Sequence, residues 1–193
     1  LINLINNTPE TKMKKLFPYQ VGFTSPPFDF DAAPSDFLRM CPNTVGVHGW
    51  MMHDPEYNHE LDQRKKNFHK LEEFVHCMSR NGVDVCGQVG SNWVHASGLG
   101  VEGIKSFCEK LTVKYKTKFI MAGYAMVEAL RHMNVERIAL NAVYHWPEWW
   151  RGTVNFLSEA GFDVVWAGNF VDQGWFKTQK EVIESVKDLF PNI

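Results

Sequence analysis

Residues 82–92 read Gly-Val-Asp-Val-Cys-Gly-Gln-Val-Gly-Ser-Asn, a short apolar run that ends at a glycine and two small polar residues. Such a run between turn residues is typical of a buried strand. A segment of helical period ends just before it at Asn81-Gly82, and another follows it from Val101 to Leu111. A strand between two helices is the repeating unit of a parallel sheet, so this stretch predicts an α/β fold.

The same alternation runs along most of the chain. We predict strands at residues 19–25, 44–51, 83–89, 118–122, 137–143 and 162–167, with helices between them. Thr178 and Glu181 have the spacing of a capping box, which predicts the start of a last helix. Three strands precede about residue 112 and at least two follow it, which suggests two similar α/β halves. The expected division is a tail at 1–18, a first lobe at 19–112 and a second lobe at 113–193.

Composition excludes several classes of protein. The 193 residues are 45% hydrophobic and 22% charged, as in a globular domain. With 20 Lys and Arg against 22 Asp and Glu, the net charge of -2 argues against a nucleic-acid partner. Neither a membrane-spanning apolar run nor a signal-peptide pattern is present, so we expect a soluble, cytoplasmic protein. The four cysteines lie far apart and are expected to be free thiols.

Loops at the carboxyl ends of the predicted strands are where an open α/β sheet binds its ligands. The loop from Gly90 to Gly98 offers backbone N–H groups, the Ser91 hydroxyl and the Asn92 amide, which together suit an anion. It is neither a dinucleotide fingerprint nor a P-loop, and an ordinary tight turn is the alternative. Tyr144 ends the fifth strand at the same edge, either to donate to a substrate oxygen or to pack as an interfacial aromatic.

Other reactive side chains are assigned structural roles. Cys86 lies inside the third strand and is predicted to be inert core rather than a nucleophile. The histidine and acidic residues at 53–60 lack a metal-ligand spacing, so we expect no metal site. Four of the seven tryptophans fall in or beside the site loops, where they either wall a pocket or form a subunit interface: Trp93, Trp146, Trp149 and Trp150.

With these loops laid out, the chain resembles the aspartate/glutamate racemase superfamily, and within it the branch of arylmalonate decarboxylase and maleate cis-trans isomerase. The resemblance covers about residues 19–190. It rests on the order and spacing of four segments: Val21-Gly22-Phe23-x-x-Pro26-Pro27, Gly82-Val83-Asp84-Val85 leading to Val89-Gly90-Ser91-Asn92, the run from Ala129 to Leu140, and Tyr144.

The resemblance implies two pseudo-symmetric, Rossmann-like lobes with parallel sheets and the substrate held between them. It implies chemistry without a cofactor, in which hydroxyl and backbone donors hold a substrate carboxylate and cysteine thiols act as acid, base or nucleophile. Racemases and isomerases of the superfamily carry one cysteine in each half. This chain has Gly90 at the first position, as the decarboxylase does. The second cysteine is expected beyond Ile193, on a last strand that the second lobe lacks here.

We therefore expect a lyase that decarboxylates a substituted malonate, with a catalytic residue that stays unknown. The alternatives are a maleate-type isomerase or racemase, and a catalytically silent carboxylate-binding protein. A small carboxylic acid is the expected partner, no membrane partner is expected, and homo-oligomerisation is left open. The expected substrate-binding residues are Pro27, Gly90, Ser91, Asn92, Trp93 and Tyr144; Asn92 departs from the hydroxyl residue that is usual in the relatives.

Overall fold

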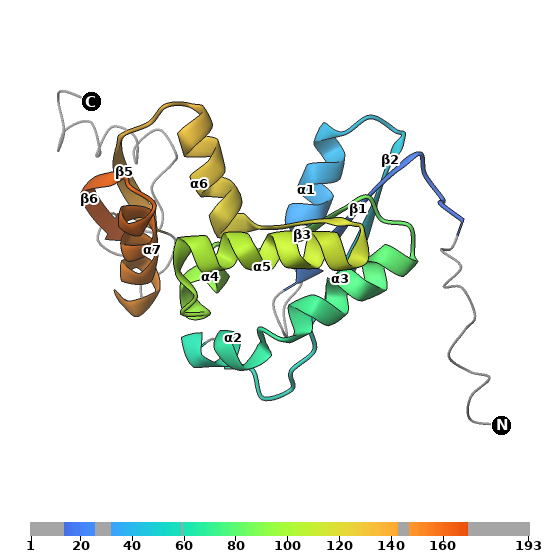
Figure 1. Cartoon of the computed structure of the whole chain (residues 1–193), viewed down its shortest axis with the longest axis horizontal. Helices are drawn as coiled ribbons and strands as arrows, with labels where there is room; N and C mark the ends of the chain where they lie inside the picture. Colours follow the sequence, from blue (N-terminus) through green and yellow to red (C-terminus); the bar gives the residue numbers. More distant parts are fainter. Residues whose placement is uncertain (1–13, 26–31, 59, 143–146, 170–193) are drawn as a thin grey trace.

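A computed structural model describes residues 14–25, 32–58, 60–142 and 147–169 of the chain (Figure 1). Its strands form two separate parallel sheets, one of four strands and one of two. The α/β class with parallel sheets, predicted from the sequence, is confirmed.

The first sheet has the strand order β2-β1-β3-β4. Its members are β1 (Tyr19–Ser25), β2 (Val45–Met51), β3 (Val85–Gln88) and β4 (Lys118–Met121). In this register Phe23 of β1 lies opposite Gly49 on one side and Gly87 on the other. Because β4 pairs with β3, the first sheet extends beyond residue 112, where the sequence suggested a boundary between the lobes.

Helices cover both faces of this sheet. Right-handed crossovers between parallel strands place α1 (Ala33–Met40) on one face and both α3 (Lys70–Arg80) and α5 (Gly100–Tyr115) on the other, as Figure 1 shows. Two shorter helices, α2 (Leu61–Asn67) and α4 (Trp93–Ala96), follow the carboxyl ends of β2 and β3. The helix α6 (Ala122–His132) begins directly after β4 and leads toward the second sheet.

The second sheet pairs β5 (Arg137–Ala142) with β6 (Asp163–Asn169), and α7 (Pro147–Glu159) connects them. We call β1 to β4 with their helices the first half, and β5, α7 and β6 the second half. The helix α7 packs on β6 and also against α4 and α5, so it joins the two halves.

The hydrophobic core lies mainly in the first half. Leu71, Phe74 and Val75 of α3 and Ile104 and Leu111 of α5 have no exposed surface. Phe74 and Val75 follow Leu71 by three and four residues, and Leu111 follows Ile104 by seven, or about two turns, so each helix presents one apolar stripe to the sheet. The second half adds Phe156 and Leu157 of α7 to the same cluster.

All six predicted strands are present, and the helices differ in detail. The single helix expected between the second and third strands is divided into α2 and α3, and α1 and α4 were not expected. Residues 147–150, read as loop, form the first turn of α7. The helix predicted from Thr178 and Glu181 lies outside the described residues.

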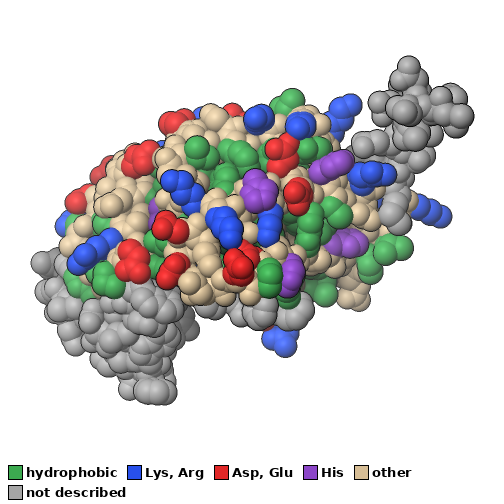
Figure 2. All heavy atoms as spheres, turned by 90° about the horizontal axis from the view of Figure 1, so that it is seen from below, with side chains coloured by type: hydrophobic (Ala, Val, Ile, Leu, Met, Phe, Trp, Pro, Cys, Tyr) green, Lys and Arg blue, Asp and Glu red, His purple; other side chains and the backbone are tan. Residues whose placement is uncertain are grey.

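No helix in the described part of the chain is long and apolar enough to cross a membrane. On the face drawn in Figure 2, basic and acidic side chains are interspersed rather than gathered by sign.

Candidate functional site

The sequence predicts an anion-binding loop at residues 90–98, but Trp93–Ala96 of this stretch form the short helix α4. We call residues 89–92, which connect β3 to α4, the anion loop. Gly90 has a φ of +95°, a backbone conformation that side-chain-bearing residues rarely adopt. The sequence places glycine here because the chain must turn sharply between the strand and α4. No side chain therefore projects from the middle of the loop.

Gln88 orients the peptide groups of this loop. Its Nε2 donates to the carbonyl oxygen of Val89 and, at 3.0 Å, to that of Gly90. In a trans peptide the carbonyl and the N–H point in opposite directions, so the N–H of Ser91 points away from Gln88. Within the described part of the chain, neither Ser91 N–H nor Asn92 N–H has an acceptor. These are the two backbone donors that the predicted anion site would use.

Asn92 has a fully buried side chain, with no exposed surface. Among the described residues, neither its Oδ1 nor its Nδ2 has a hydrogen-bond partner. A buried amide without a partner is costly and rare in native proteins, and it calls for a ligand or another explanation. A Cβ added at Gly90 would lie 3.5 Å from Asn92 Oδ1 and 3.4 Å from Cδ1 of Trp93, so both side chains pack against the glycine.

The start of α6 lies against the anion loop. A Cβ added at Gly123 would lie 2.6 Å from the carbonyl oxygen of Ser91 and 2.5 Å from Cγ2 of Val94. Only a glycine allows this approach, so the segment after β4 meets the segment after β3 at one edge of the sheet. On the β1 side, Val89 N–H donates to Thr24 Oγ1 at 3.3 Å.

Trp93 and Trp149 are buried around an arginine rather than walling an open pocket. Arg64 of α2 is only 5% exposed. Its guanidinium carbon lies 4.1 Å from the ring centroid of Trp149 and 6.0 Å from that of Trp93. Such stacking of a cation on indole faces is favourable in a desolvated place. The arginine and the two indoles join α2, α4 and α7 behind the anion loop.

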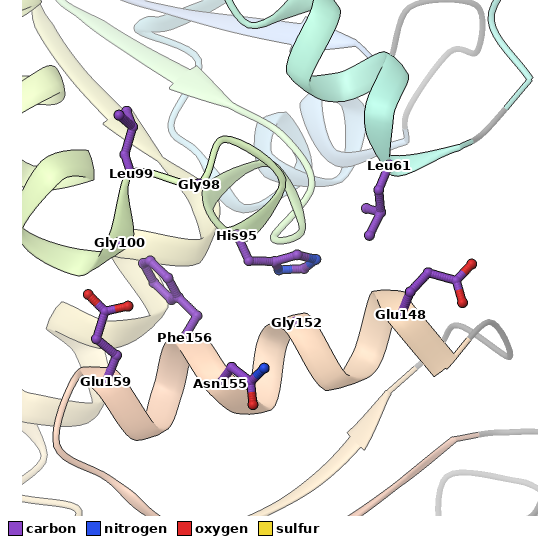
Figure 3. A pocket seen from close by; sticks show the side chains of 10 residues that line it. All are labelled: Leu61, His95, Gly98, Leu99, Gly100, Glu148, Gly152, Asn155, Phe156 and Glu159. Carbon is purple, nitrogen blue, oxygen red and sulfur yellow. The ribbon is translucent and has the colours of Figure 1, made fainter.

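A pocket of about 540 Å³ lies between α4, the start of α5 and α7. Figure 3 shows the His95 ring of α4 lying over Gly152 of α7. Burial of the ring, and to a lesser extent the Arg64 charge, lower the His95 pKa from 6.5 to about 4. The imidazole is therefore neutral at neutral pH. Of the loop predicted at residues 90–98, His95 and Gly98 line this pocket, whereas Gly90, Ser91 and Asn92 do not.

The predicted substrate-binding residues are only partly covered by the structure. Gly90, Ser91, Asn92 and Trp93 follow one another on the loop and in the first turn of α4, whereas Pro27 and Tyr144 lie outside the described residues. Sequence reasoning missed Gln88 and Arg64. The signal for Gln88 is its position as a polar residue inside an apolar strand.

Cys86 and Cys108 are buried, whereas Cys77 is exposed and Cys41 is half-buried. Cys86 is fully buried on β3, and burial raises the pKa of its thiol to about 12. Burial likewise raises the pKa of Cys108 to about 11. Neither thiol forms a reactive thiolate at neutral pH, and all four cysteines are free. Among the described residues, no three His, Cys, Asp or Glu side chains gather as metal ligands would.

The sequence matches no family model and no curated protein. Solved structures do match the fold. An arylmalonate decarboxylase without ligand superposes with a TM-score of 0.67 at 15% identity, over 90% of this chain and 74% of that one. The maleate cis-trans isomerase of Nocardia farcinica matches with a TM-score of 0.68 at 15% identity, over 88% and 72%.

The chain has the fold of these enzymes. A maleate isomerase variant from Pseudomonas putida S16, solved with maleate, matches with a TM-score of 0.66 at 15% identity. That match covers 78% of this chain and 63% of the isomerase, so the chain spans less than two thirds of it. The resemblance predicted from the sequence is confirmed at the level of the fold.

Proposed function

We propose that this protein is a cofactor-independent lyase that decarboxylates a substituted malonate. The observation that supports the proposal is that the residue in the middle of the anion loop is a glycine. Gly90 has a φ of +95° and no side chain, so no thiol stands at this position. Two-sided chemistry at one carbon needs an acid or base on each face. The loop offers hydrogen-bond donors on its side and no thiol, which favours a one-sided reaction.

The anion loop supplies what a decarboxylation needs on that side. Loss of CO₂ leaves negative charge that spreads onto the remaining carboxylate as an enediolate. Ser91, the free N–H groups of residues 91 and 92 and the Asn92 amide are donors for that charge, and Tyr144 is expected to join them. Donors fixed before the reaction stabilise such charge most effectively, and the Gln88 bonds hold this loop.

The proton that completes the reaction needs a donor from the second half, which stays unassigned. In the superfamily this role belongs to a cysteine. A Nocardia farcinica isomerase variant was solved with a covalently bound succinylcysteine intermediate, so cysteine chemistry occurs in proteins of this fold. Cys86 does not fit the role, because its thiol is fully buried and its pKa is raised to about 12.

An isomerase or racemase is the alternative, since isomerase and decarboxylase structures match this chain about equally. Both alternatives would use a thiol where Gly90 stands. We expect Gly90→Cys to add some racemising activity toward the chiral product, with a cost in stability of about 1–2 kcal/mol because φ is positive.

The deciding experiment supplies the full-length protein with phenylmalonate and with maleate. We expect CO₂ from phenylmalonate and no fumarate from maleate. Ser91→Ala should lower the decarboxylation rate by about 10²-fold or more. The matched control is Ser106→Ala on the exposed side of α5, which should leave the rate unchanged.

The other outcomes separate the alternatives. Fumarate from maleate, without CO₂ from any malonate tried, would replace the lyase by an isomerase. Stabilisation by carboxylates with no turnover at all would indicate a silent binding protein. Whether the protein proves to be an isomerase or a silent binding protein, carboxylates should raise its melting temperature, and Ser91→Ala and Tyr144→Phe should make this increase smaller.

A further inference from the structure

The strand β2 lies at one edge of the first sheet, next to β1 only. Tyr19 N–H donates to the carbonyl oxygen of Thr44 at 3.2 Å, and the register between β1 and β2 continues from there without a shift. In such a ladder, alternate residues of β2 turn their N–H and C=O groups toward β1, and the residues between them turn these groups outward. The outward groups belong to Val47 and Gly49, and no strand in the described part of the chain pairs with them.

The two edge strands of this sheet differ in their protection. Edge strands of monomeric proteins are usually short, or carry a charge, a proline or a bulge, because they would otherwise pair with another chain. The strand β4 has four residues and begins with the exposed Lys118. The strand β2 has seven residues, none of them charged and none a proline, and its pairing has no bulge. It thus has the composition of a strand that pairs on both sides.

The helix α1 presents an apolar surface beside this edge. It contacts β2, and its Phe37 ring packs edge-on against the ring of Phe23, with 5.3 Å between the centroids. Yet no residue of α1 is buried, and Leu38 and Met40 are 44% and 79% exposed. An amphipathic helix normally buries its apolar face. The helix and the open edge next to it therefore form one uncovered surface.

We propose that β2 pairs with β2 of a second copy of this chain, so that the first sheets of the two copies become one continuous sheet. A two-fold axis normal to the sheet makes the paired strands antiparallel and closes the assembly as a dimer. Each α1 then lies beside the axis on the same face, where Leu38 and Met40 of the two copies meet. The charged residues of α1 are Asp36 and Arg39, so the helix has no net charge and two copies do not repel each other.

A second copy suits this surface because the surface is its own complement. An antiparallel copy of β2 offers the same outward N–H and C=O groups in the reverse order, so each donor meets an acceptor. Gly49 is exposed, and a Cβ added there would meet nothing within 4 Å, which leaves a neighbouring strand free to approach. The inference does not rest on the proposed function, since β1 separates β2 from the strand that carries the anion loop.

Sedimentation velocity of the full-length protein over a range of concentrations tests the proposal. We expect the mass of two chains at micromolar concentration. Gly49→Lys places like charges close to each other across the axis and should weaken the association at least about tenfold. The control is Val113→Lys, at a position of α5 that is 77% exposed, which should leave the association unchanged.

A matched pair of methionine variants tests the part of α1. Met40 and Met133 are both exposed and both stand at the carboxyl end of a helix, where a positive charge is tolerated. Met40→Lys should weaken the dimer, because it places a charge in the apolar contact between the two α1 helices. Met133→Lys, at the end of α6, should leave it unchanged.

Hydrogen exchange shows whether β2 itself forms the contact. The N–H groups of Val47 and Gly49 should exchange more slowly as the protein concentration rises, whereas those of His48 and Trp50, which face β1, should not respond. A wild-type protein that is monomeric at every concentration would overturn the inference, and protected Val47 and Gly49 amides in that monomer would show that another segment of the chain covers the edge. A dimer that survives both Gly49→Lys and Met40→Lys would equally overturn it.

Discussion

The two halves of the molecule differ in how completely they are buried. In the first half, β3 and β4 bury alternate residues such as Cys86 and Phe119, and α3 and α5 cover them. In the second half, every residue of β5 before Ala142 is exposed or half-buried. The loop after β3 is thus built on the half with the larger core, and the second half contacts that core through α7 and through partly buried residues of its strands such as Ile138 and Val164.

The joint between the halves consists of a few identifiable contacts. Glu159 at the end of α7 accepts from Val101 N–H of α5 at 2.8 Å. The His95 ring occupies the space beside Gly152, and Arg64 stacks on Trp149. The comparison teaches that changes in the first core should alter the whole protein, whereas changes at the joint should alter mainly the second half.

The largest effect should come from the first core. Phe74 is fully buried on α3, with its ring centroid 5.8 Å from that of Trp50 and 6.5 Å from that of Phe119. Phe74→Ala should lower the free energy of unfolding by about 3–5 kcal/mol, because it removes a large apolar side chain and leaves a cavity. Urea unfolding measures the loss. Met133→Ala, at a position 62% exposed, is the control. Equal losses of unfolding free energy in the two variants would show that the first core does not dominate the stability.

His95, at the contact between the two halves, should make the stability of the protein depend on pH. The pKa of His95 is lowered from 6.5 to about 4 by burial. Between these pH values the unfolded chain binds a proton that the folded protein does not, so stability falls as the pH falls. The loss reaches up to about 3 kcal/mol at pH 4. In His95→Gln this slope should flatten between pH 6.5 and 4, and an unchanged slope would assign the effect to other groups.

A smaller effect is expected where α7 approaches α4. A Cβ added at Gly152 would lie 2.3 Å from Cδ2 of His95, whereas one added at Gly49 on β2 would meet nothing within 4 Å. Gly152→Ala should therefore destabilise the protein by about 1–3 kcal/mol, and Gly49→Ala should not. Hydrogen exchange shows where the change acts, and amides of β5 and β6 should lose protection before those of β1 and β3.

The smallest effect should come from the end of α7. Glu159 satisfies the Val101 N–H in the first turn of α5, where a negative charge also suits the helix terminus. Glu159→Ala should cost about 1 kcal/mol, as loss of a helix cap does. Glu109→Ala on the exposed side of α5 is the control. A thermal melt in which both variants behave alike would show that this contact does not hold the halves together.

Much of the fold could be predicted from local patterns. Apolar runs between turn residues located all six strands, and the expected helix ends at Gly82 and Asn134 have positive φ values of 71° and 55°. The helix α4 escaped prediction because four residues are too few for a period to show. The start of α7 was missed although Pro147 stands in its first turn, a position that favours proline.

For the candidate site, the sequence alone determined where the loop after β3 lies and that Gly90 stands in it, since a strand, a glycine turn and a following helix are signals of neighbouring residues. Only the tertiary structure decided which side chains surround that loop. Arg64 reads as one charge among several on a helix, yet Trp149 from the other half covers it. The sequence predicts Asn92 as a substrate-binding residue of the loop, but only the structure shows that its side chain is fully buried and has no hydrogen-bond partner among the described residues. Burial and hydrogen bonding of a polar group depend on residues distant in the sequence, and no local pattern reports them.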